Sequence, residues 1–161
     1  MKYPILLYPD PRLRKCSEPV VRFDGPLKKF LQDLTDVMFR QPMGLGISAP
    51  QVGVLQRILI VDVGKKMPGA SLRWILNPEI LAAEEPVLGK EGCMSIPEYT
   101  AHVRRPRKIR LRWQDENGRF CESEFFDIEA RCMQHEIDHL DGILFIDKVV
   151  SLKSDLIPRR K

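Results

Sequence analysis

The residues best suited to chemistry are two histidines four positions apart, with a glutamate directly after the first. They lie in QHEIDHL (residues 134–140), as His135, Glu136 and His139, and the chain holds three histidines in all. Four residues are about one helical turn, so on a helix both imidazoles project from one face beside the carboxylate. This pattern is typical of two metal ligands and a general base. On this stretch alone, the alternative is a helix whose histidines are ordinary core or surface residues without a metal.

A helix over residues 128–141 is expected to carry these side chains, with Asp127 as its cap and Gly142 as its terminator. At about 100° per residue, the face of the histidine pair holds Ile128, Cys132, His135, Glu136 and His139. The opposite face holds Ala130, Met133, Ile137 and Leu140, and a narrow polar strip holds Arg131, Gln134, Asp138 and Asp141. Because a helix that is apolar on two sides must be buried on two sides, we expect this one to run through the middle of the structure.

The first half of the chain predicts elements that pack around this helix. Residues 1–24 contain several turn-forming prolines and predict an irregular arm. An amphipathic helix is predicted from Gly25-Pro26 to about Phe39, with apolar residues at helical spacing. Residues 57–63 predict a buried strand, and residues 72–78 predict a second strand that ends at Pro78.

The second half predicts further strands. Residues 108–113 alternate, so Ile109, Leu111 and Trp113 are expected to face the core. The neighbouring arginines at 104, 105 and 107 are interpreted as a solvated basic face. Asn117-Gly118 predicts a hairpin turn, residues 119–126 its returning strand, and residues 143–146 a strand-like segment. The predicted fold is therefore α+β, with mainly antiparallel sheets around a central metal-binding helix, an N-terminal amphipathic helix and a short C-terminal tail.

Bulk composition limits the classes of protein that need to be considered. The 161 residues fit one domain over residues 1–161, and 43% hydrophobic with 30% charged residues is typical of a soluble globular protein. No apolar run is long enough to span a bilayer and the first residues lack a secretion signal, so we expect a cytoplasmic protein without membrane association. Four irregularly spaced cysteines then predict buried thiols or a metal ligand rather than disulfides. A net charge of +4 permits contact with a polyanion but implies no specific nucleic acid.

Two predicted loops add candidate residues. Residues 44–51 (GLGISAPQ) match a loose dinucleotide-binding pattern. That pattern should follow a strand and open a helix, whereas this segment follows a predicted helix and runs into proline, so a dinucleotide site is not expected. Its glycines would instead let backbone approach a ligand closely, with the amide of Gln51 as a donor. Residues 91–97 place Cys93 in a loop bounded by glycine and proline, where a buried thiol without a role is the alternative to a ligand.

Three separated stretches, taken together, resemble the motifs of the peptide deformylases. They are GLGISAPQ (residues 44–51), EGCMS (91–95) and QHEIDH (134–139), against family patterns close to GxGxAAPQ, EGCLS and QHExDH. The resemblance extends from residues 9–14 to residues 141–145 and covers most of the chain. The sequence departs from the family at Ser48, where alanine is usual, at Met94, where leucine is usual, and at Asp127, where many members have glycine.

The resemblance implies a metal-dependent hydrolase with a three-residue metal site. Cys93, His135 and His139 would hold one divalent metal ion with water in the fourth position, and Glu136 would be the general acid and base. We expect Fe²⁺ in the cell, with Zn²⁺, Ni²⁺ or Co²⁺ as alternatives, because a Cys-His-His set suits several metals. The implied reaction removes the N-formyl group from the formylmethionine that begins a newly synthesised polypeptide and releases formate.

The remaining site residues are also implied by the resemblance or proposed from it. The side chain of Gln51 and the backbone N–H of Met94 would form the oxyanion hole, and Glu91 would support the metal loop. Gly46, with Leu45 beside it, would hold the peptide. On the metal face of the helix, Ile128 and Cys132 are our hypothesis for part of the methionine side-chain pocket, with a purely structural role as the alternative. A transient contact between the basic tail, residues 159–161, and the ribosome is a further hypothesis.

Two other readings of the histidine pair stay open at this point. A zincin-type endopeptidase also uses HExxH, with a third ligand downstream of the helix, for which Asp147 is a weak candidate. A structural metal domain would close its site with a fourth protein ligand, and Cys132 lies on the right face for that role. The position of the third ligand separates the endopeptidase from the deformylase, and a closed site with four protein ligands and no exchangeable water would favour the structural domain.

Overall fold

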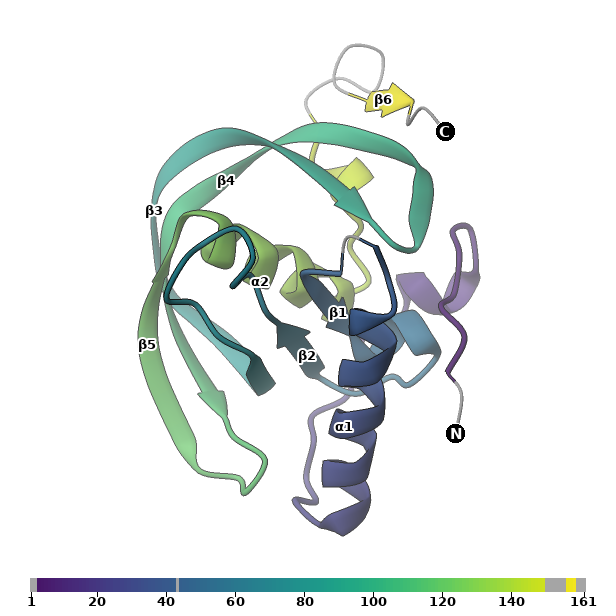
Figure 1. Cartoon of the computed structure of the whole chain (residues 1–161), viewed down its shortest axis with the longest axis vertical. Helices are drawn as coiled ribbons and strands as arrows, with labels where there is room; N and C mark the ends of the chain where they lie inside the picture. Colours follow the sequence, from purple (N-terminus) through teal and green to yellow (C-terminus); the bar gives the residue numbers. More distant parts are fainter. Residues whose placement is uncertain (1–2, 43, 150–155, 159–161) are drawn as a thin grey trace.

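Helix α2 (Asp127–Leu140) lies in the middle of the molecule, with a twisted sheet curving around it (Figure 1). The computed structural model describes residues 3–42, 44–149 and 156–158. Strands β3 (Arg73–Cys93) and β4 (Ile96–Gln114) arch over the helix, and β5 (Phe120–Phe126) continues the sheet along one side. The expected α+β arrangement around a central helix is therefore confirmed.

The sheet is antiparallel throughout the described residues. Its order is β1 (Gly46–Ser48), β2 (Ile58–Val61), β3, β4 and β5, and β6 (Leu156–Pro158) pairs separately with β4. Ile109, Leu111 and Trp113 of β4 are buried, as their alternation predicts, and Gly118 turns the chain into β5 with a φ of 81°. The long β3–β4 hairpin thus dominates the side of the molecule that covers α2.

Strand β3 is much longer than the sequence predicts. It does not stop at Pro78 but continues to Cys93, so the predicted end was wrong. The register of β3 against β4 shifts between Leu76 and Glu79 and again between Ile80 and Ala82. A proline that lacks an N–H is tolerated at such a bulge, because the ladder bond it cannot make is already missing there. Cys93 consequently ends a strand rather than lying in a free loop.

Helix α1 (Gly25–Phe39) packs against β1 and β2. The backbone N–H of Leu27 donates to the carboxylate of Asp24, at 3.0 Å, and Pro26 occupies the first turn. The residues that the helix buries are Leu27, Leu31, Leu34, Thr35, Val37 and Met38. Because these side chains meet Ile47, Ile58 and Ile60, α1 fixes the two short strands that lie beside α2.

The N-terminus of α2 differs from the prediction. Phe126, not Asp127, is the capping residue, and no side chain caps the helix, so the predicted Asp127 cap was wrong. Asp127 is already inside the first turn with a φ of 55°, a region that favours glycine. Its carboxylate instead accepts a hydrogen bond from Arg107, at 3.1 Å. At the other end, Gly142 follows the last turn with a φ of 74°, in agreement with the predicted terminator.

Helix α2 is buried on both faces. Its apolar face, with Ala130, Met133 and Leu140, packs against buried residues of β2, β3, β4 and β5. The other face carries His135, Glu136 and His139, which are 7%, 4% and 1% exposed. Within the polar strip, Gln134 is also buried, and its side chain donates to the carbonyl of Pro106 at 2.9 Å.

The segment after α2 forms a short 3₁₀ helix, η3 (Phe145–Asp147), and not a strand. The carboxylate of Asp147 accepts a hydrogen bond from the backbone N–H of Leu144, at 2.9 Å, which favours a tight turn over an extended chain. The phenyl ring of Phe145 stacks on the imidazole of His135, with centroids 5.9 Å apart. The basic residues 159–161 lie outside the described residues.

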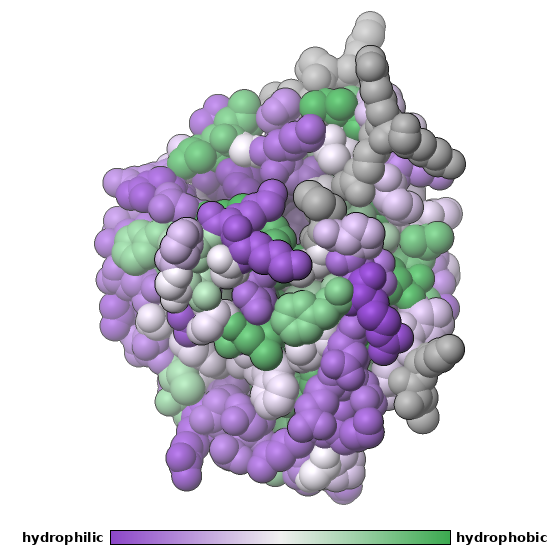
Figure 2. Space-filling model, viewed as in Figure 1, coloured by the Kyte–Doolittle hydropathy of each residue, from purple (hydrophilic) through white to green (hydrophobic). Residues whose placement is uncertain are grey.

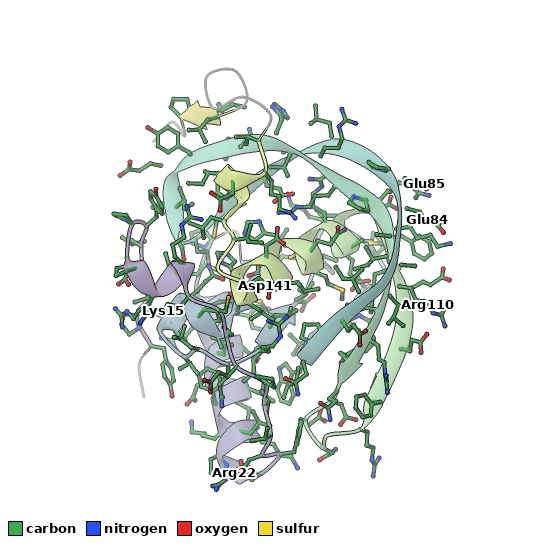
Figure 3. All side chains as sticks on the ribbon, turned by 180° about the vertical axis from the view of Figure 1, so that it is seen from behind. Lys15, Arg22, Glu84, Glu85, Arg110 and Asp141 are labelled. Atoms are coloured by element: carbon green, nitrogen blue, oxygen red, sulfur yellow. The ribbon has the colours of Figure 1, made fainter. Side chains whose placement is uncertain are left out.

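Hydrophilic residues cover most of the face that Figure 2 shows, and hydrophobic residues gather near its middle. The exposed outer side of the sheet is also charged, with Glu84, Glu85 and Arg110 pointing away from α2 (Figure 3). Within the described ranges, we find no helix with the length and apolar character needed to cross a membrane.

Candidate active site

Three metal-ligating side chains converge where β3 ends against α2. The ligand atoms of Cys93, His135 and His139 all lie within 4.8 Å of one another, and all three residues are buried. The Sγ of Cys93 lies 3.3 Å from the Nε2 of His139. The β3–β4 hairpin causes this convergence, because it returns over α2 and places the last residue of β3 beside the helix. The structure thus brings together the three residues that the motifs single out, as a possible metal site.

The donor set and its charge suit a divalent cation. His135 shares a hydrogen bond of 2.9 Å between its Nδ1 and the carboxylate of Glu91, which leaves Nε2 available as a ligand. Burial lowers the pKa of His135, but Cys93 and Glu91 outweigh it and raise the pKa well above the usual value. One thiol and two imidazoles are the donors that zinc and iron sites use.

The carboxylate of Glu91 is held by a buried arginine. Arg105 donates to both oxygens, through Nε at 2.5 Å and Nη2 at 3.0 Å, and it also donates to Asp138 at 2.8 Å. Burial raises the pKa of Glu91, but the bonds from His135 and Arg105 outweigh it and lower the pKa to about 2. The interpretation of Arg105 as part of a solvated face was wrong, because the alternation of β4 turns it inward, where it is 4% exposed.

Glu136 offers a free oxygen at the same place. Its Oε1 is buried and has no hydrogen-bond partner among the residues that the structure describes. Burial raises the pKa of Glu136 to about 7. A carboxyl group with such a pKa can take and return a proton near neutral pH. The residue thus has the position and the environment of a general base, while its catalytic role stays a prediction.

Gln51 approaches the metal ligands from the other side. It lies in the 3₁₀ helix η2 (Ala49–Val52), directly after β1, and is 1% exposed. Its Oε1 accepts from the backbone N–H of Ser48, at 3.0 Å, and from the Ser48 hydroxyl, at 3.2 Å. Its Nε2 donates to the hydroxyl of Ser95, at 3.1 Å, and lies 3.5 Å from the Sγ of Cys93. The amide N–H₂ is therefore aimed at the cysteine ligand.

The geometry agrees with what comparison finds. A family model described as polypeptide deformylase matches residues 2–155 of the chain. The chain belongs to the peptide deformylase family. A peptide deformylase of Mesorhizobium japonicum is 42% identical over 158 residues, which cover 98% of this chain and 89% of the relative. A relative with the same name from Alkalilimnicola ehrlichii is 43% identical over 157 residues, which cover 97% of this chain and 86% of the relative.

Solved peptide deformylase structures share the fold as well. The crystal structure from Thermotoga maritima superposes with a TM-score of 0.87 at 38% identity and covers 94% of this chain and 99% of that one. The structure from Legionella pneumophila gives 0.87 at 36% identity and covers 95% of this chain and 89% of that one. The family resemblance of the three motifs is thereby confirmed, together with the fold.

The remaining predicted site residues lie at different distances from the three candidate ligands. Gly46 lies in β1 against α2, where an added Cβ would meet the Sγ of Cys132 at 2.6 Å. Leu45 and Ile128 are partly buried and pack on the apolar cluster of α2, as does Cys132. Met94 follows Cys93 in the turn between β3 and β4. The structure thus brings Gly46 and Cys132 to the site, whereas Ile128 packs on the core cluster.

The rival ligands have other partners. Asp147 pairs with Arg14 and accepts from Leu144. Cys132 faces Gly46 and lies outside the group of ligand atoms found in the described residues. Motif reasoning, in turn, did not assign Arg105 or Ser95 to the site. For Arg105, the alternation of residues 105 and 109–113 along one strand was a usable signal, because it places the arginine on the inner face.

Proposed function

We propose that this chain removes the N-formyl group from formylmethionine at the start of newly synthesised polypeptides and releases formate. The observation that carries the proposal is the convergence of Cys93, His135 and His139 beside the unpartnered oxygen of Glu136. These three side chains would hold one divalent metal ion. Bound there, the ion supplies the Lewis acidity that makes water a nucleophile at neutral pH.

Glu136 handles the proton in this proposal. Its buried Oε1 accepts a proton from the attacking water, and the same carboxyl returns a proton to the amide nitrogen as the C–N bond breaks. The amine can then leave as a neutral group rather than as an amide anion. The raised pKa suits both steps near neutral pH, because neither protonation state is strongly favoured.

The oxyanion donors come from two loops. As water attacks, negative charge gathers on the formyl oxygen, and the Nε2 of Gln51 and the backbone N–H of Met94 donate to it. Gln51 is pre-oriented for this task, because Ser48 fixes its oxygen and so fixes which end of the amide faces Cys93. One such donor typically contributes about 3 to 4 kcal/mol of transition-state stabilisation.

Strand β1 offers an edge for the peptide. It is the terminal strand of the sheet order, with β2 on one side. The backbone N–H of Asp62 donates to the carbonyl of Leu45, so the alternation of an antiparallel pair turns the N–H and C=O of Gly46 away from β2. An extended peptide can pair with Gly46 there. We propose that Leu45, Ile128 and Cys132, which are partly buried beside the core cluster of α2, line the pocket for the methionine side chain of this peptide.

The same strand explains a preference for formyl over acetyl groups. Gly46 stands so close to Cys132 and Glu136 that no added carbon fits between them. We propose that this close packing also limits the space next to the formyl carbon, so that the extra methyl of an acetyl group would clash. One methyl is worth about 1 to 3 kcal/mol by binding alone, so the selection depends on the rigidity of β1.

The wider setting is proposed from the function. Formylated nascent chains are made in the cytoplasm of bacteria, and we propose that the enzyme acts there. We propose Fe²⁺ as the metal in the cell, with Zn²⁺, Ni²⁺ or Co²⁺ able to replace it, since the donor set suits all four. Transient ribosome contact through residues 159–161 is a further proposal.

A formate-release assay tests the function directly. The protein is stripped of metal, reconstituted with each of the four ions under nitrogen, and given a formyl-methionyl peptide or its acetyl analogue. We expect formate from the first peptide, no acetate from the second, and loss of the ferrous activity in air because the thiolate site is open to oxidation. Absence of formate with every metal would overturn the assignment. Replacing Cys93 by alanine should remove both metal and activity, whereas retained metal would favour a ligand in the tail.

A further inference from the structure

A second arginine binds the carboxylate that supports His135. Arg131 lies on α2, one turn before His135, and its Nη1 donates to the Oε2 of Glu91 at 2.6 Å. The same Nη1 donates to the carbonyl of Val103 in β4, at 2.9 Å, and Nη2 donates to the carbonyl of Val87 in β3, at 2.9 Å. One guanidinium therefore joins the helix of the metal ligands, both strands of the hairpin and Glu91. Its side chain is 15% exposed.

The hairpin has a glycine where this guanidinium lies. A Cβ added to Gly89 would stand 2.7 Å from the Cζ of Arg131 and 2.8 Å from its Nε and Nη2. Gly89 is the register partner of Val103, whose carbonyl Arg131 binds. Gly89 has no positive φ, so its lack of a side chain is needed for space and not for backbone conformation. Gly89 and Arg131 form one interlocked pair.

We propose that Arg131 is a positioning residue for the metal ligand His135, that it acts through Glu91, and that Gly89 provides the space it needs. This inference rests on the proposed function for what the site holds. Arg105 reaches Glu91 from β4 and fixes the carboxylate relative to the sheet. Arg131 reaches it from α2, on the same helix as His135, and fixes the carboxylate relative to the ligands. Both arginines are needed, because the bond between Glu91 and His135 joins the sheet to α2.

The physical reason is the orientation of an imidazole. A metal-binding histidine is oriented by the acceptor on its other ring nitrogen, and loss of that partner typically lowers metal affinity about 10- to 100-fold. Without Arg131, the Oε2 of Glu91 loses one of its charged donors and two hairpin carbonyls lose a donor each. Glu91 then tilts toward Arg105, and the ring of His135 loses its fixed direction.

The first experiment measures how fast the metal leaves. Zinc-loaded protein is mixed with a chelator, and we expect Arg131→Met to lose zinc about 10-fold faster than the parent. Arg131→Lys, which keeps one charge and reaches part of the network, should lie between the two. Arg110→Met is the matched control, because Arg110 is exposed on the outer sheet and pairs with Glu122 (Figure 3). Equal rates for Arg131→Met and the parent would overturn the proposal.

A double-variant cycle uses the glycine to test the same link without removing the arginine. Gly89→Ala should displace the guanidinium and raise the rate of zinc loss to within a few-fold of that of Arg131→Met. In the Arg131→Met background the same alanine should have little further effect, since no guanidinium is left to displace. Equal effects of Gly89→Ala in both backgrounds would overturn the interlock. Gly25→Ala is the control, because an added Cβ there meets nothing within 4 Å.

A spectroscopic measurement separates positioning from general stability. At saturating Co²⁺, the visible absorption bands report ligand geometry, and we expect them to shift in Arg131→Met and Gly89→Ala but not in Arg110→Met. Unchanged bands in the first two variants would assign Arg131 a structural role alone. These readings need no turnover, so the positioning role can fail while the parent still releases formate, and the proposed function can fail while the metal-loss difference stands.

Discussion

Gly46 and Cys132 face each other so closely that no β-carbon fits between strand β1 and helix α2. A Cβ added to Gly46 would lie 2.6 Å from the Sγ of Cys132, 3.0 Å from the Oε2 of Glu136 and 3.2 Å from its Cγ. A side chain at this position of the first motif would therefore force β1 or the side chains of α2 to shift. This contact joins the proposed peptide-binding strand to the proposed general base.

Replacing Gly46 by alanine should lower kcat/KM for a formyl-methionyl peptide by about 100-fold, because a displacement near 1 Å at the reacting groups has that effect. The added methyl must push β1 away from α2 or turn the carboxylate of Glu136. Steady-state formate release measures the loss, and zinc content should stay near that of the parent. Gly25→Ala, which adds a methyl in open space, is the control. Full activity in Gly46→Ala would show that β1 can move without cost.

Replacing Gln51 by leucine should lower kcat by about 10²- to 10³-fold, the usual effect of losing one oxyanion donor. Metal content should not change, because Gln51 contacts Cys93 through a long 3.5 Å bond and is not a ligand itself. Ser48→Ala tests how the orientation of the Gln51 amide contributes. It removes the hydroxyl bond to Gln51 but keeps the backbone bond, so we expect a loss below 10-fold. A larger loss in Ser48→Ala than in Gln51→Leu would contradict this role of Gln51.

The sequence was sufficient for the centre of the site, because local spacing and motif order carry that information. Two ligands one turn apart on a helix need no knowledge of the fold, and Cys93 followed from the order of the three motifs. The alternation of residues 109–113 likewise predicted a strand and its buried face. These features depend on contacts between residues that are near in sequence or on a family pattern.

Features that depend on distant contacts were not predictable in the same way. The course of β3 past Pro78 depends on bulges against β4, which residues 72–78 alone cannot show. The partners of Arg105, Glu91 and Asp138, lie 14 and 33 residues away, so its ion pairs could not be seen in the sequence, although the alternation of β4 indicates its inward face. The segment at 143–146 reads as apolar and extended, yet Asp147 turns it into a 3₁₀ helix.

Replacing Glu136 by glutamine should lower kcat by about 10²- to 10⁴-fold, because the amide cannot take the proton from water or return one to the leaving nitrogen. The change keeps the size of the side chain, and it leaves the three proposed metal ligands in place. Metal analysis of the purified variant should therefore give one ion per chain. Glu122→Gln on the exposed strand β5 is the control. Loss of metal together with activity would indicate that Glu136 acts on the ligands rather than on the substrate.

Replacing Asp127 by glycine should stabilise the fold by about 0.5 to 1 kcal/mol. Asp127 holds a φ of 55°, which costs a non-glycine residue on the order of 1 kcal/mol, whereas glycine adopts it freely. The same change removes the exposed ion pair between Asp127 and Arg107, but exposed ion pairs contribute little to the free energy of unfolding. Urea unfolding should show a higher midpoint at an unchanged slope. Asp127→Asn separates the two effects, because asparagine tolerates this φ but cannot form the ion pair, so its midpoint should fall slightly or stay. A lower midpoint than the parent's in both Asp127→Gly and Asp127→Asn would show that the carboxylate, and not the backbone, decides stability at the start of α2.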